Sequence, residues 1–78
     1  MVRLFDNDNE AEIGPITEDQ LNFLQEELVE ETIDAYTFAL SPSSIDSLRK
    51  NGGDPRLVEM LRTAIGTRAS MEIRYELD

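Results

Sequence analysis

The chain has 78 residues, of which 17 are Asp or Glu and 7 are Lys or Arg, so its formal net charge at pH 7 is −10. This length suits one small domain, spanning residues 1–78. So acidic a chain repels phosphate backbones, which argues against direct nucleic-acid binding. Because His and Cys are absent, the composition excludes a Ser-His-Asp triad, a cysteine nucleophile, disulfides and thiolate or imidazole metal sites.

No apolar stretch approaches the roughly 20 residues that cross a bilayer. The first residues, Met1 to Asp6, lack the basic and apolar regions of a signal peptide. We therefore expect a cytoplasmic protein that does not contact the membrane. A core of this size is only marginally sufficient, so self-association into a homodimer is a further expectation.

The charges are unevenly distributed along the chain. Residues 1–39 contain eleven acids and a single base, Arg3, whereas residues 40–78 contain six acids and six bases. The first half therefore carries the whole net charge.

The N-terminal residues predict a β-hairpin. Val2–Phe5 has strand character, Asp6–Asn9 supplies residues that favour turns, and Ala11–Ile13 forms the second extended piece.

A helix is predicted over Glu18–Glu31. Thr17 is a typical N-cap and Gln20, three residues later, completes a capping box. Leucines then recur at helical spacing and predict an inward-facing stripe. These are Leu21, Leu24 and Leu28.

The rest of the chain predicts one short extended piece, two helices and a final strand. Asp34–Leu40 alternates apolar and small side chains, which indicates a short strand or an extended connector. Ser41 and Asp54 each cap a helix that begins with proline, over about residues 42–51 and 55–65. Met71–Leu77 alternates apolar and charged residues, as a half-buried antiparallel strand does.

Together these elements predict an α+β fold. We expect a small antiparallel sheet, made of the N-terminal hairpin and the C-terminal strand, packed against about three helices.

The predicted turn contains oxygen ligands at the spacing of a partial calcium loop: Asp6, Asp8, Glu10 and Glu12. Position 6 of that template is Ala11 instead of glycine, and position 12 is Thr17 instead of glutamate. A divalent-cation (Ca²⁺) site is therefore an alternative, and a polar hairpin turn is favoured over it.

The first helix carries a second candidate surface. Phe23 lies about 140° around the helix from the centre of the leucine stripe, on the same side as three glutamates. An aromatic side chain flanked by carboxylates suits a basic, partly apolar protein surface. The alternative, that Phe23 packs in the core, is favoured because large aromatic residues are usually buried. The candidate partner-binding residues are Phe23, Glu26, Glu27 and Glu30.

Several segments resemble a family of small acidic bacterial proteins of unknown function. They are Leu4-Phe5-Asp6-Asn7-Asp8, Glu12-Ile13-Gly14-Pro15-Ile16-Thr17-Glu18, Gln20-Leu21, Phe23-Leu24, Leu61-Arg62, Ala64-Ile65-Gly66 and Met71-Glu72-Ile73-Arg74. The resemblance covers nearly the whole chain and carries no catalytic motif. Some members carry an automatic label of galactosyldiacylglycerol synthase. We do not adopt that label, because 78 residues have no room for nucleotide-sugar and lipid sites and contain no glycine-rich phosphate loop. The resemblance implies a bacterial, cytoplasmic protein.

The sequence favours a non-enzymatic protein-binding or regulatory module without a cofactor. Its expected partner is a protein with a basic surface, or a second copy of the chain. Two alternatives remain open: divalent-cation binding by the hairpin turn, and mimicry of nucleic acid to inhibit a DNA-binding protein.

Overall fold

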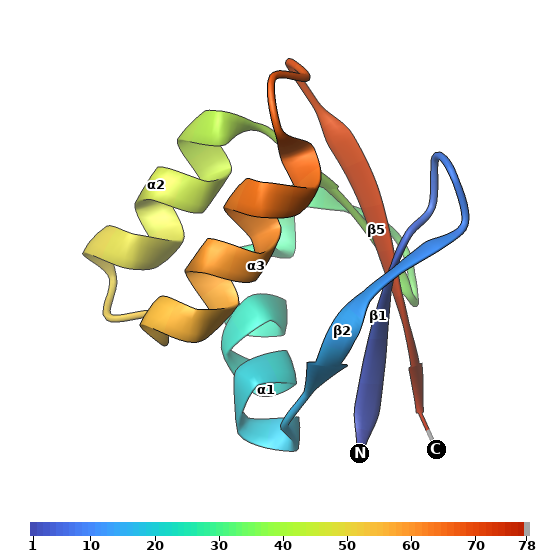
Figure 1. Ribbon diagram of the computed structural model, residues 1–78. Coiled ribbons are helices and arrows are strands. Elements are labelled where there is room, and N and C mark those ends of the chain that lie inside the picture. The colour runs from blue at the N-terminus through green and yellow to red at the C-terminus, as the bar shows by residue number, and fades with distance from the viewer. Residues whose placement is uncertain (78) are drawn as a thin grey trace.

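Five strands form one antiparallel sheet in the computed structural model, which describes residues 1–77 (Figure 1). The strand order across the sheet is β2-β1-β5-β4-β3. The predicted α+β class is confirmed, and the C-terminal strand lies directly beside the first strand of the N-terminal hairpin. The strands are β1 (Val2–Asp6), β2 (Ala11–Ile16), β3 (Thr32–Asp34), β4 (Thr37–Leu40) and β5 (Met71–Leu77).

The helices cover one face of this sheet (Figure 1). They are α1 (Glu18–Glu27), the short 3₁₀ helix η1 (Val29–Glu31), α2 (Pro42–Lys50) and α3 (Pro55–Ile65). Within residues 1–77, no helix has both the length and the apolar character needed to cross a membrane.

Each long helix begins with the cap that the sequence predicts. The Thr17 hydroxyl accepts the Gln20 backbone N–H at 3.0 Å, and the Gln20 side chain accepts the Thr17 N–H at 2.8 Å. Ser41 caps α2, and Asp54 caps α3 by accepting the Arg56 N–H. These caps satisfy N–H groups that have no partner within the helix.

The first helix is shorter than predicted. Regular α-helix ends at Glu27 rather than Glu31, and η1 continues the chain. The Thr32 hydroxyl donates to the Leu28 carbonyl at 3.0 Å, which satisfies one of the free carbonyls at this end. Two β-branched residues, Thr32 and Ile33, follow and favour a strand.

Two strands extend beyond the predicted ranges and one was missed. β1 reaches Asp6, and β2 continues to Ile16 instead of ending at Ile13. Thr32–Asp34 is a separate strand, and it forms a hairpin with Thr37–Leu40 across a turn at residues 35 and 36. Within the predicted extended piece over Asp34–Leu40, Asp34 ends β3, residues 35 and 36 form the turn, and Thr37–Leu40 is β4.

The core lies between the sheet and the three helices. Alternate residues of β1 and β5 point into it, including Leu4 and Ile73, which are both fully buried. Tyr75 is also buried; its hydroxyl donates to the Ala35 carbonyl and accepts from the Gln25 amide. Leu77 departs from the predicted inward pattern because it is 63% exposed at the end of β5.

Candidate functional site

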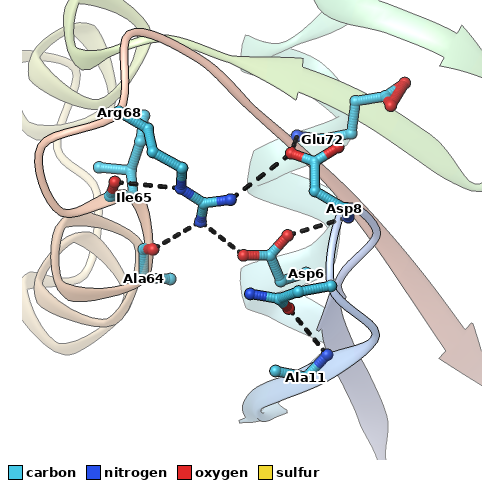
Figure 2. Close-up of polar contacts among 8 residues, drawn as sticks. Asp6, Asp8, Ala11, Ala64, Ile65, Arg68 and Glu72 are labelled. Carbon is cyan, nitrogen blue, oxygen red and sulfur yellow. Dashed lines mark hydrogen bonds and ion pairs between the residues drawn. The ribbon is translucent and has the colours of Figure 1, made fainter.

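The acids of the N-terminal hairpin are paired with three arginines, of which two come from the second half of the chain. Arg68, in the loop before β5, contacts both Asp6 and Asp8 (Figure 2). Arg74 of β5 lies 3.1 Å from the Glu10 carboxylate, and Arg3 of β1 lies 3.4 Å from that of Glu12. Basic residues of the second half therefore neutralise much of the hairpin's negative charge.

Asp6 is the centre of this arrangement. Burial alone raises its pKa, but a hydrogen bond from the Arg68 guanidinium and the Asp8 backbone N–H at 3.0 Å together lower that pKa below its ordinary value. Arg68 also donates to the carbonyls of Ala64 and Ile65 at the end of α3 (Figure 2). The contact ties the hairpin turn to the loop between α3 and β5.

The same geometry argues against the calcium alternative. Asp6, Asp8, Glu10 and Glu12 face three different arginines instead of one common point. Across the described residues 1–77, no group of three or more acids is placed to hold a metal ion. The favoured interpretation of this segment, a polar hairpin turn, agrees with the structure, and we do not propose a cation site there.

A groove separates the end of α1 and η1 from α2. We call it the acidic groove, and its volume is about 520 Å³. This size falls within the range of typical binding pockets. One wall consists of glutamates and the other of serines and an asparagine. Its lining residues are Glu26, Glu27, Leu28, Val29, Glu30, Glu31, Ser41, Ser43, Ser44, Ser47, Leu48 and Asn51.

The local fold explains why the glutamates line this groove. Leu24 and Leu28 of the predicted stripe are fully buried and fix α1 against the core. The turn that contains Leu28 is held by its N–H donating to the Leu24 carbonyl at 2.8 Å. The intervening and following glutamates must then face outward.

The described structure offers the glutamates of the acidic groove no basic side chain as a partner. Among residues 1–77, no ion pair involves any of its four glutamates, and no Lys or Arg is among its lining residues. The last turn of α1 contains no basic residue, so the negative end of the helix dipole adds to the glutamates. The groove can therefore accept cationic groups, and the hydroxyls of Ser43 and Ser47 are further hydrogen-bond acceptors outside the capping box of α2.

The structure brings together three of the four predicted partner-binding residues. Glu26, Glu27 and Glu30 line the acidic groove, whereas Phe23 lies one turn earlier beside a separate depression that includes Gly52 and Leu57. Phe23 is half-buried and packs against the core. This position agrees with the core interpretation of Phe23, and the Phe23→Ala variant described in the Discussion tests whether the ring also contacts a partner.

Sequence reasoning missed the second wall of the groove. Ser41 and Ser44 form the capping box of α2, and Ser43 and Ser47 are exposed on the same helix. Serines at residues 41–47 lie across the groove from the glutamates only because the fold places α2 opposite the end of α1 and η1, and no local pattern indicates that arrangement.

A comparison of this chain with protein-family models, with curated proteins and with solved structures finds no match. The resemblance to small acidic bacterial proteins therefore stays a prediction.

Proposed function

We propose that this protein is a non-enzymatic binding module that receives a basic segment of a partner protein in the acidic groove. The observation that carries the proposal is the set of four glutamates on one wall, without a counter-ion among residues 1–77. Lysine or arginine side chains of a partner would neutralise these glutamates. The bacterial and cytoplasmic setting that the sequence analysis expects belongs to the same proposal.

The contrast between the hairpin and the groove supports this assignment. Both regions are rich in acids, yet the hairpin acids are paired within the fold and the groove glutamates are not. Clustered like charges repel one another, which costs stability. Charge that the fold does not use internally is available to steer and select a basic partner.

The test compares three tagged proteins in a pull-down from bacterial lysate, with bound proteins identified by mass spectrometry. They are the unaltered chain, the groove variant Glu27→Gln/Glu30→Gln, and the control variant Glu59→Gln/Glu72→Gln. Glu59 and Glu72 also have no ion pair among residues 1–77, so each variant removes two unpaired negative charges.

The proposal predicts a partner that the unaltered chain and the control variant capture and that the groove variant loses. Raising the salt concentration should release that partner, because exposed charges are screened. Equal capture by all three proteins would contradict a role for the groove.

A further inference from the structure

We propose that the partner segment binds in extended conformation and adds a sixth strand to the sheet at β3. This inference rests on the proposed function, and it specifies the backbone conformation of the partner. The occupant is a segment of another protein that alternates basic and apolar residues.

The edge of the sheet at β3 is open. β3 pairs with β4 on one side, and it has no neighbouring strand on the other side within residues 1–77. All three of its residues are exposed. The opposite edge strand, β2, contains Pro15, which has no N–H to donate to an added strand. Addition of a peptide to an exposed edge is a common mode of recognition.

Apolar side chains around β3 are exposed as well. Val29, Ile33 and Tyr36 are 66%, 52% and 55% exposed. A register shift separates the two pairs that β3 makes with β4, and it leaves Ile33 without an opposite residue. A segment lying on this edge could cover these side chains with apolar residues of its own.

The charge around β3 decides which segment fits. Glu30 and Glu31 precede the strand and Asp34 is its last residue, and the sequence contains no Lys or Arg between Arg3 and Arg49. A second copy would bring the same acids to the edge and be repelled. A segment with lysines or arginines at alternate positions would instead be attracted.

Residues of the acidic groove and of the open edge are adjacent in the sequence. Val29 to Glu31 form η1 and line the groove, and β3 begins at the next residue, Thr32. One extended segment can therefore pair its backbone with β3 and direct a basic side chain toward the groove glutamates.

The probe is the blocked peptide acetyl-Lys-Val-Lys-Val-Lys-Val-amide. Its binding to the isotope-labelled full chain is followed by NMR, together with amide hydrogen exchange. Two further peptides carry N-methyl groups, one on every valine nitrogen and the other on every lysine nitrogen. Each one removes the N–H donors along one side of the extended peptide.

Strand addition predicts that bound peptide slows exchange of at least one amide among residues 32–34 by about tenfold or more, with β2 amides unchanged. At least one methylated peptide should bind about tenfold more weakly. The variant Ile33→Lys should weaken peptide binding to a similar extent. The control variant Leu77→Lys adds the same charge at another exposed apolar strand residue, and it should change the affinity less than about twofold.

Three results would overturn the inference. If the peptide shifts groove resonances while β3 exchange is unchanged and both methylated peptides bind normally, strand addition fails and the proposed function stands. If the peptide does not perturb the groove, both fail. If β3 amides are already protected in a concentration-dependent way without peptide, a second copy is the occupant.

Discussion

Asp6 is the only carboxylate that the structure buries almost completely among residues 1–77, with 3% of its surface exposed. Its lowered pKa means that the folded state holds the proton less tightly than the unfolded chain does. The contribution of Asp6 to stability is therefore present above its ordinary pKa of 3.8 and is lost as the pH falls through the lowered value.

The variant Asp6→Asn should have a free energy of unfolding about 1 to 2 kcal/mol lower at pH 7, because its charge-assisted hydrogen bonds are lost. The loss stays this small because water partly screens Arg68. Between about pH 5 and pH 3 the variant should lose less stability than the unaltered chain. Urea denaturation at both pH values measures these differences. The same acid-induced loss in both proteins would show that Asp6 does not carry this dependence.

At the scale of elements, the beginnings of the helices could be predicted from sequence and one of the ends could not. A cap such as Thr17 with Gln20 is a contact between residues three positions apart, so a local pattern contains it. The end of α1 has no glycine to mark it, and β3 is a strand only because it pairs with β4. The Asp6–Arg68 contact joins residues 62 positions apart, which no local pattern reveals.

The candidate site also has a part that the sequence predicts and a part that it does not. Glu26, Glu27 and Glu30 could be found because the predicted helix over Glu18–Glu31 would place like charges four residues apart, where they repel one another. Their separation from Phe23 and their position opposite α2 depend on tertiary packing. The sequence therefore predicts the glutamates that form one wall of the acidic groove, but it does not predict that a groove lies beside them.

Phe23 connects α1 to the loop between α2 and α3. A methyl group added at Gly53 would lie 3.0 Å from Phe23 Cε2 and 2.7 Å from the Leu48 carbonyl oxygen, which shows how closely these parts approach. The ring is therefore part of the packing between elements.

We expect Phe23→Ala to lower the free energy of unfolding by about 2 kcal/mol. A fully buried aromatic residue would cost about 3–5 kcal/mol, and Phe23 is only half-buried. Affinity for the basic peptide should change less than about twofold, since Phe23 does not line the acidic groove. Denaturation and peptide titration of this variant check the two expectations separately. An intact fold with weakened binding would instead establish Phe23 as a contact residue.

At the scale of the whole molecule, the charge of −10 is distributed in two ways. The acids at the hairpin end are interleaved with Arg3, Arg68 and Arg74, whereas the acidic groove has no counter-ion among residues 1–77. Net charge alone gives weak, unselective attraction to any cation. The groove glutamates should therefore contribute more to binding than equally charged residues elsewhere.

The most direct measurement compares the affinity of the lysine-valine peptide for the unaltered chain, Glu27→Gln/Glu30→Gln and Glu59→Gln/Glu72→Gln, at one salt concentration. Circular dichroism first confirms that all three are folded. The groove variant should bind about tenfold more weakly, while the control should stay within about twofold of the unaltered chain. Equal affinities for the two variants would show that only net charge matters, and would contradict the groove as the binding site.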